Sequence, residues 1–352
     1  MKPRIRVAVL MGGRSSEHEI SVASARSVLE SLDRRRYEAV TVEINREGKW
    51  QLEAGESRSL ERGVVGELDE GEGRTAVETL PIPTASVPAT LAEVDVVIPV
   101  LHGPFGEDGT VQGLLELAGV PYVGAGVTAS ALAMDKDLFK SVMRDQGIPV
   151  TRNVTLRPGD PARNPFGYPV FVKPARLGSS VGISKVREEA ELAPAVELAR
   201  RHDEKVLVEE FVPGVEIEVG VLGNRDPIAS LPGQVVSHFN DWYDYSSKYD
   251  EGGSDLLVPP PTLSAEQCER AQQLAVEAFV ATDCEGMARV DFFVREADGE
   301  VIVNELNTIP GFTATSFYAR LFDASGIPYP KLLDRLVELA LERHERRSRL
   351  VY

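Results

Sequence analysis

The fold is decided by two strand-like segments near the C-terminus and the short turn after them: Met287-Ala-Arg-Val-Asp-Phe-Phe-Val294, Glu300-Val-Ile-Val-Asn-Glu-Leu-Asn-Thr308 and Pro310-Gly-Phe312. Because side chains in a strand alternate between its faces, Arg289 shares a face with Asp291, and Glu305 shares one with Asn307. If the two strands are antiparallel neighbours, three oxygen ligands and one guanidinium meet at one point.

Oxygen ligands of this kind, without His or Cys, are typical of a Mg²⁺ site that also holds substrate phosphates. We therefore predict that Asp291, Glu305 and Asn307 bind metal. The alternative is a hairpin with ordinary surface charges. It is disfavoured because carboxylates within runs of Val and Ile are costly unless they are paired or coordinated.

A nucleotide site also needs an element that binds phosphates. The sequence contains no Gly-x-x-x-x-Gly-Lys-Ser/Thr, so the chain is not a P-loop protein. The segment 168–185 instead predicts a strand ending in Lys173, the loop Gly178-Ser179-Ser180, and a second strand from Val181. Backbone N–H groups in such a loop can form a nest for an anion, and Lys173 adds a point charge. The loop alone is a weak signal, but together with the metal strands it predicts a phosphate site.

Two further strand-like segments, 205–212 and 215–222, carry carboxylates beside a Pro-Gly turn. Such groups can accept hydrogen bonds from an adenine amino group and a ribose hydroxyl. We expect Glu209 and Glu216 to have these roles, whereas Glu218 is expected to lie on a solvated strand face.

The bulk properties exclude several classes of protein. The 352 residues suffice for two or three domains. A formal net charge of −17 predicts repulsion of nucleic acid and anionic membranes, which leaves small molecules and protein subunits as partners. The chain has neither an apolar run long enough to span a membrane nor a secretion signal. We therefore expect a cytoplasmic protein in which Cys268 and Cys284 are reduced.

The hydrophobic patterns predict an α/β protein of three units: an N-terminal open parallel sheet with helices, a small strand-rich centre with one helix, and a C-terminal α+β unit with the metal strands. We place the units at 1–127, 128–224 and 225–352. Ligands should bind at the carboxyl ends of the parallel strands, near Gly12, Gly13 and His102. The expected strands are 5–11, 39–44, 94–100 and 121–123, and the expected helices include 17–32, 188–201, 331–344 and one capped by Ser264-Ala-Glu-Gln267. Residues 53–80 are interpreted as a solvated excursion.

One competing interpretation starts from Gly124-Ala-Gly-Val-Thr-Ala129, which matches a dinucleotide-binding fingerprint. That fingerprint needs an acidic residue at the end of the next strand, about twenty positions later. Asp145 has the spacing but is expected in a helix. A dehydrogenase would also leave the metal strands and the Lys173 loop without a role.

The ordered motifs resemble those of the ATP-grasp superfamily, and specifically of bacterial D-alanine–D-alanine ligases. The resemblance rests on the Lys173 loop, Glu-Glu-Phe-Val, Arg-Val-Asp and Asn-Glu-Leu-Asn-Thr, and it extends to four further segments: 11–21, 101–113, 243–249 and 310–316. Only about 53–90 lies outside it. The resemblance implies that ATP phosphorylates one D-alanine and that the amine of a second D-alanine displaces the phosphate.

The resemblance also implies a role for each matching residue. Two Mg²⁺ (or Mn²⁺) ions would be held by Asp291, Glu305 and Asn307. ATP would contact Lys136, Lys173, Ser179, Ser180, Glu209, Glu210, Phe211, Val212, Glu216, Lys248, Asn304 and Glu305. The substrate-binding residues would be Glu17, His102, Arg289, Gly311 and Ser316. The catalytic residues would be Glu17, Ser179, Tyr249, Arg289, His102 and Gly311.

The motifs leave two alternatives to this function, and they also lead to two further expectations, a lid and a homodimer. The second substrate could be D-lactate or D-serine, although the Lys248-Tyr249 pair favours D-alanine. The chain could bind nucleotide as a regulatory protein without turnover, which the complete set of phosphate, metal and oxyanion groups disfavours. The aromatic segment 237–254 predicts a lid that closes over the site. A homodimer is expected.

Overall fold

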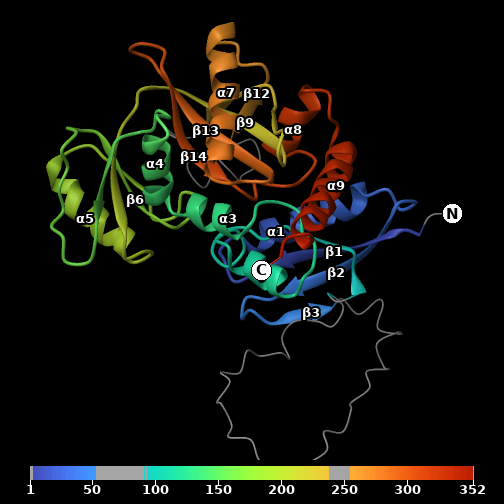
Figure 1. Cartoon of the computed structure of the whole chain (residues 1–352). Coiled ribbons are helices and arrows are strands. Elements are labelled where there is room, and N and C mark those ends of the chain that lie inside the picture. Colours follow the sequence, from blue (N-terminus) through green and yellow to red (C-terminus); the bar gives the residue numbers. More distant parts are fainter. Residues whose placement is uncertain (1–2, 53–90, 92, 238–253, 352) are drawn as a thin grey trace, which may run out of the picture.

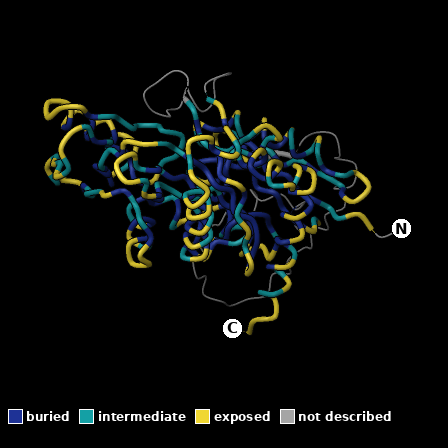
Figure 2. Tube along the Cα trace, turned by 90° about the horizontal axis from the view of Figure 1, so that it is seen from above, coloured by how far each residue is buried: buried dark blue, intermediate teal, exposed yellow. Residues whose placement is uncertain are grey.

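The computed structural model describes residues 3–52, 91, 93–237 and 254–351. Its strands form three sheets, each with helices packed against it (Figure 1). Buried segments run through the centre of the molecule and exposed ones lie at its periphery (Figure 2). The predicted α/β class and three-part architecture are confirmed.

The N-terminal sheet has the order β3-β2-β1-β4. Its strands are β1 (Ile5–Gly12), β2 (Tyr37–Ile44), β3 (Trp50–Leu52) and β4 (Val96–Pro99). β1 pairs in parallel with β2 and β4, as predicted, and only β3 is antiparallel to its neighbour. The expected strand at 121–123 is reduced to one bridge between Val97 and Tyr122, because Pro121 has no N–H and the chain turns at Gly124, where φ is +94°.

Helix α1 (His18–Ser31) covers this sheet, and α2 (Thr110–Leu117) follows β4. The buried face of α1 is built from small side chains that let the helix approach β1 closely: Ser21, Ser24, Ala25 and Val28. Gly12, with φ +87°, ends β1 where a Cβ would lie 2.3 Å from the carbonyl of Ile44. Only glycine fits there, so the chain can turn from β1 toward the ends of the parallel strands.

The central sheet is antiparallel, with the order β5-β8-β6-β7. Its elements are β5 (Asn153–Leu156), β6 (Val170–Pro174), β7 (Ser184–Val186), β8 (Val206–Glu210) and the helix α5 (Glu189–Arg200). Val172 and Val208 of the sheet form a core with Val196 of α5.

The third sheet has the order β12-β11-β9-β13-β14, and β10 pairs with β9. Its strands are β9 (Gly214–Gly223), β10 (Ile228–Ala229), β11 (Gly233–Ser237), β12 (Ser254–Leu257), β13 (Gly286–Arg295) and β14 (Val301–Asn307). Helix α7 (Ala265–Ala281) covers it and begins with the predicted capping box of Ser264 and Gln267. The domain limits stay a prediction. The limit at 224 would assign β9 to the central unit, whereas β9 pairs along its whole length with β13 of the third sheet.

Four helices join the units: α3 (Val127–Met134), α4 (Lys136–Asp145), α8 (Phe317–Ala324) and α9 (Tyr329–Ser348). α9 lies between the N-terminal sheet and the third sheet (Figure 1). Its buried residues share one core with Val9 of β1 and Met287 of β13. Arg343 of α9 donates to the Tyr122 carbonyl at 2.7 Å, and Arg36 pairs with Asp334 at 2.7 Å. The N-terminal unit and the third sheet are therefore packed together.

The predicted lid, 237–254, lies almost wholly outside the described residues. Its two ends are described, because Ser237 of β11 pairs with Ser254 of β12 in an antiparallel ladder. Cys268 and Cys284 are free thiols, as predicted. Within the described ranges, no helix combines the length and the apolar character that crossing a membrane requires.

Candidate active site

β13 and β14 are antiparallel neighbours, which meets the condition on which the predicted metal site depends. Asp291 lies opposite Glu305, and Arg289 lies opposite Asn307. The pairing then shifts, since Phe292 lies opposite Val303 and leaves Asn304 as the extra residue of a β-bulge. A bulge re-aims the side chains beside it. This one turns both Asn304 and Glu305 toward the same cavity.

The two strands hold their carboxylates among donors and cations. Arg289 donates from Nε and Nη2 to the two oxygens of Asp291, both at 2.7 Å. Asn307 Nδ2 donates to the same carboxylate at 2.9 Å. Glu305 Oε2 lies 3.4 Å from Lys136 Nζ. Two carboxylates and one amide oxygen supply the hard ligands that Mg²⁺ or Mn²⁺ prefers, so these residues fit the predicted metal. Clusters of three or more His, Cys, Asp or Glu suited to metal are absent from the described residues.

The expectation that Glu218 lies on a solvated strand face is wrong. Glu218 is 1% exposed, and it lies opposite Asp291 in the pairing of β9 with β13. Its Oε2 is 3.2 Å from Arg289 Nε. Strand alternation placed Glu218 on the correct face, but that face packs inside the protein. Arg289 is therefore held between two carboxylates.

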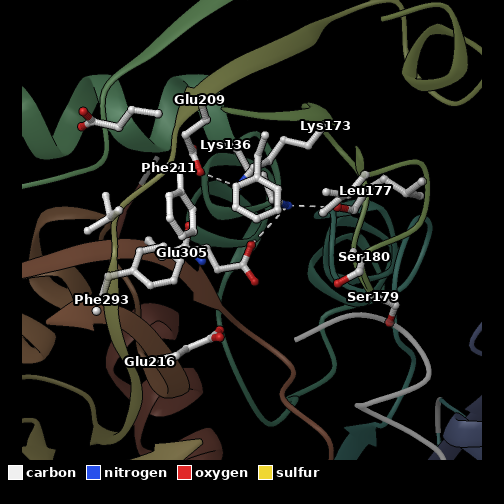
Figure 3. A pocket seen from close by; sticks show the side chains of 17 residues that line it. Lys136, Lys173, Leu177, Ser179, Ser180, Glu209, Phe211, Glu216, Phe293 and Glu305 are labelled. Atoms are coloured by element: carbon white, nitrogen blue, oxygen red, sulfur yellow. Dashed lines mark hydrogen bonds and ion pairs between the residues drawn. The ribbon is translucent and has the colours of Figure 1, made fainter. Parts of the chain in front are cut away.

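A cavity of about 180 Å³ lies between the central and third sheets. Its lining includes every predicted ATP-binding residue that the structure describes: Lys136, Lys173, Ser179, Ser180, Glu209, Glu210, Phe211, Val212, Glu216, Asn304 and Glu305. Lys248 lies outside the described residues. Figure 3 shows Phe211, Phe293 and Glu216 around the cavity, with Lys136 joined by dashed lines to Leu177 and Glu305. An apolar slot with cations at one end suits a base with attached phosphates.

Glu209 is enclosed by two lysines. Lys173 Nζ donates to Glu209 Oε1 at 2.6 Å, and Lys140 Nζ lies 2.8 Å from Oε2. Burial alone would raise the pKa of Glu209, but the two lysines outweigh it and hold that pKa at about 2. Burial lowers the pKa of Lys140 to about 8. Lys140 is not among the residues predicted from the sequence, although it lies one helical turn after Lys136 and so on the same face of α4.

The Gly178–Ser180 loop connects this cavity to the N-terminal unit. Ser179 and Ser180 have φ values of +50° and +57°, a strained conformation in which successive N–H groups can face one side. Ser179 Oγ donates to Glu17 Oε1. Two of the predicted catalytic residues, Glu17 and Ser179, are therefore in contact, and a third, Tyr249, lies outside the described residues.

A second cavity, of about 390 Å³, lies beside the first. Its lining includes all the predicted substrate-binding residues: Glu17, His102, Arg289, Gly311 and Ser316. Gly178, Ser179 and Glu305 line both cavities. The serine loop and β14 therefore form a wall that is common to both cavities.

Two titratable groups at the N-terminal wall have shifted pKa values. Burial lowers the pKa of His102 by more than nearby Glu17 raises it, which leaves the imidazole neutral near pH 7. His102 Nδ1 lies 3.0 Å from the Ile309 carbonyl, so this nitrogen is the donor. Burial and the charge of Glu17 raise the pKa of Glu107 to about 8. Glu107 lines the second cavity and accepts from the Gly103 N–H at 2.9 Å. Glu107 is not among the residues predicted from the sequence, although it ends the segment His-Gly-Pro-Phe-Gly-Glu that begins at His102.

The opposite wall is the Pro310–Ser316 turn before α8. Ser316 Oγ accepts from the Thr313 N–H at 3.0 Å, and Ser316 is the residue immediately before the first turn of α8. A Cβ at Gly311 would lie 3.3 Å from Ser316 Oγ. A hydroxyl beside the N–H groups of a helix start is suited to a carboxylate.

A cavity between two sheets that suits a base with attached phosphates, with the acidic residues of β13 and β14 and a second cavity beside it, is the arrangement expected of an ATP-grasp ligase, a class of enzyme that forms C–N bonds. The chain belongs to the D-alanine–D-alanine ligase family, since the models described as D-ala D-ala ligase N-terminus and C-terminus match residues 6–125 and 142–338. The resemblance stated from the motifs is thereby confirmed.

Individual relatives agree with the family. The D-alanine–D-alanine ligase of Natranaerobius thermophilus is 43% identical over 362 residues, covering 98% of this chain and 97% of the relative. The solved VanG D-Ala:D-Ser ligase of Enterococcus faecalis is 34% identical with a TM-score of 0.79, covering 96% of this chain and all of that one. The D-alanine–D-alanine ligase of Bacillus anthracis, solved with ATP, is 27% identical with a TM-score of 0.75, covering 98% and 100%.

Proposed function

We propose that the protein condenses two D-alanines at the expense of ATP, giving D-alanyl-D-alanine, ADP and phosphate. The observation that carries this proposal is the common wall of the two cavities, Gly178, Ser179 and Glu305. It would bring the phosphate end of a bound nucleotide next to the second cavity, where Glu17 offers a carboxylate to an ammonium and Arg289 a guanidinium to an oxyanion.

The chemistry requires two displacements. A carboxylate is a poor acyl donor because its leaving group would be oxide. Attack of a carboxylate oxygen of the first D-alanine on the γ-phosphorus forms an acyl phosphate and releases ADP. The amine of the second D-alanine then attacks the acyl carbon and loses a proton, and phosphate leaves as the C–N bond forms. Positioning and charge neutralisation carry most of the rate in such transfers.

The nucleotide roles follow the first cavity. Lys136 and Lys173 would contact the α- and β-phosphates, and Ser179 and Ser180 would add donors. Glu216 would reach the ribose, and Phe211 and Val212 would line the base. Glu210 and Asn304 would complete the pocket. Because both Glu209 oxygens contact lysines, we propose that Glu209 orients Lys173 in addition to its expected contact with the adenine amino group.

Asp291, Glu305 and Asn307 would hold two Mg²⁺ (or Mn²⁺) ions. When bound, these ions would neutralise the negative charge of the ATP phosphates and the further negative charge that develops on them during transfer. The protein's own part is to supply those three oxygen ligands and to keep Lys136 close to Glu305. Arg289 would keep its ion pair with Glu218 while Asp291 binds metal.

The substrate roles follow the second cavity. Glu17 would accept the ammonium of the first D-alanine, with neutral His102 beside it. Arg289 and the Gly311 N–H would face the oxyanion of the tetrahedral intermediate, and loss of one such donor typically costs about 10²–10³-fold in rate. Ser316 would bind the carboxylate of the second D-alanine.

Further parts of the proposal concern segments and partners. Lys248 would contact the γ-phosphate, and Tyr249 would close the 237–254 lid by joining Glu17 and Ser179. The domain limits at 127 and 224, a homodimer and a cytoplasmic location are proposed on the grounds given by the sequence. A net charge of −17 argues against nucleic acid and anionic membranes as partners.

The second candidate is a ligase that joins D-alanine to D-serine or D-lactate, which the likeness to a D-Ala:D-Ser ligase favours. One experiment separates the two functions. Phosphate release and the acylated product are measured with ATP, Mg²⁺ and D-alanine, and then with D-serine or D-lactate added. D-alanyl-D-alanine as the main product supports our proposal, whereas a mixed product at equal acceptor concentration would replace it with the second candidate.

A further inference from the structure

Lys140 of α4 is the most deeply buried lysine beside the nucleotide cavity, and no role in the reaction has so far been given to it. The residue is 0% exposed. Its Nζ lies 2.8 Å from Glu209 Oε2 and donates to Thr151 Oγ1 and, at 3.1 Å, to the Asn304 carbonyl. Its partners come from the central sheet, from the segment before β5, and from the bulge of β14.

These three contacts join the two halves of the nucleotide cavity. Glu209 also binds Lys173, the lysine of the central sheet that is proposed to contact phosphate. Asn304 is the bulge residue immediately before the metal ligand Glu305. A chain of contacts therefore runs from Lys173 through Glu209 and Lys140 to the backbone that carries Glu305.

Burying a lysine this deeply is costly unless its charge and its donors are all matched. Lys140 meets this condition with one carboxylate, one hydroxyl and one carbonyl, which together suit the three donors of an ammonium. A methionine of similar length would fill the same space and supply none of these contacts. Hydrophobic packing alone would therefore not explain a lysine at this position.

We propose that Lys140 is a positioning residue that couples the phosphate lysine Lys173 to the metal strand. It sets the distance between Lys173 and Glu305, so nucleotide bound at one is presented correctly to metal bound at the other. This inference rests on the proposed ATP site. Its consequence is that Lys140 raises the affinity for nucleotide more when metal is present than when it is absent.

Lys205 is a matched control. It is also buried and pairs with carboxylates, Asp135 at 2.5 Å and Asp137 at 3.5 Å. Those two residues belong to the start of α4, so this lysine fixes the helix to the central sheet. Its ion pairs do not reach β14. Lys205→Met should cost stability as Lys140→Met does, without the effect on metal coupling.

The test measures ADP binding calorimetrically, once with EDTA and once with Mg²⁺, for the unaltered protein, Lys140→Met and Lys205→Met. The readout is the dissociation constant of ADP with EDTA divided by that with Mg²⁺, so a large ratio means that metal strengthens binding. Thermal melting of each variant accompanies the measurement. We expect Lys140→Met to reduce this ratio by about 5- to 150-fold, the usual range for coupling between two sites. The KM for ATP should rise, while the KM for the first D-alanine stays within about twofold, a split that loss of stability alone does not produce.

If Lys140→Met does not fold, Thr151→Val removes one partner of the lysine, and a smaller reduction of the ratio is expected. A ratio that stays unchanged in the folded variant, or that falls equally in Lys205→Met, overturns the inference and leaves the proposed function intact. Failure of the unaltered protein to bind ADP with or without Mg²⁺ overturns the proposed function, and this inference with it.

Discussion

Replacing Glu209 by glutamine should destabilise the protein strongly at neutral pH, because it leaves two lysines without their common counter-charge. Glu209 is 1% exposed and contacts Lys173 at 2.6 Å and Lys140 at 2.8 Å. Its pKa lies at about 2 instead of the ordinary 4.5, a difference of about 2.5 and hence about 3–4 kcal/mol at about 1.4 kcal/mol for each pKa unit. Removing one partner of a buried ion pair commonly costs about 3–5 kcal/mol, which agrees.

The pH dependence of this effect has a defined sign. Since the pKa of Glu209 is lower in the folded than in the unfolded protein, its contribution is complete above about pH 4.5 and is lost as the pH falls toward 2. The free energy of unfolding of Glu209→Gln should therefore lie about 3–4 kcal/mol below that of the unaltered protein at pH 7. The gap should narrow as the pH falls through this window, because a protonated glutamate carries no more charge than a glutamine.

The assay is urea unfolding followed by circular dichroism between pH 7 and pH 3. Glu210→Gln is the control in the same strand. Glu210 pairs at 2.6 Å with Arg152, whose side chain is 70% exposed, so this change should cost at most about 1 kcal/mol. Equal stability of Glu209→Gln and Glu210→Gln at pH 7, or a gap between Glu209→Gln and the unaltered protein that does not change with pH, would refute the assignment of Glu209 to the two lysines.

Three further predictions concern the reaction. Glu305→Gln should fold normally and lose turnover, since the metal site loses a charge; near-normal turnover at saturating Mg²⁺ would contradict the metal assignment. Glu17→Gln should raise the KM of the first D-alanine about 10- to 100-fold, because a charge-assisted hydrogen bond is worth about 1.5–3 kcal/mol; steady-state kinetics showing weaker ATP binding instead would reverse the roles of the two cavities. Glu107 holds a proton up to about pH 8 in the folded protein but only to 4.5 when unfolded, so its contribution to stability falls as pH rises through this window. Glu107→Gln should flatten that fall in thermal melting between pH 5 and 8, and an unaltered slope would show that Glu107 is ionised at neutral pH.

The sequence sufficed for the features that depend on local pattern. Strand alternation placed Arg289 with Asp291 and Glu305 with Asn307, and the antiparallel pairing of β13 with β14 brought the two pairs together. The capping box at Ser264 was predictable because its two hydrogen bonds span only three residues. The order of the motifs was sufficient for the family, because each motif keeps its residue types at fixed spacing.

The environment of each charge was decided by the tertiary structure. Alternation gives the face of a strand but not what covers that face, so Glu218 was expected in solvent and is instead buried against Arg289. Lys140 contacts residues 11, 69 and 164 positions away in the chain, and no local pattern encodes such a meeting. The shifted pKa of Glu107 likewise depends on burial and on Glu17, the residue immediately before α1. Sequence by itself therefore determined which chemical groups the site contains. The packing of the three sheets decided which of these groups are paired, which are neutral and which hold one another in place. The reason is that desolvation and charge pairing act through space and not along the chain.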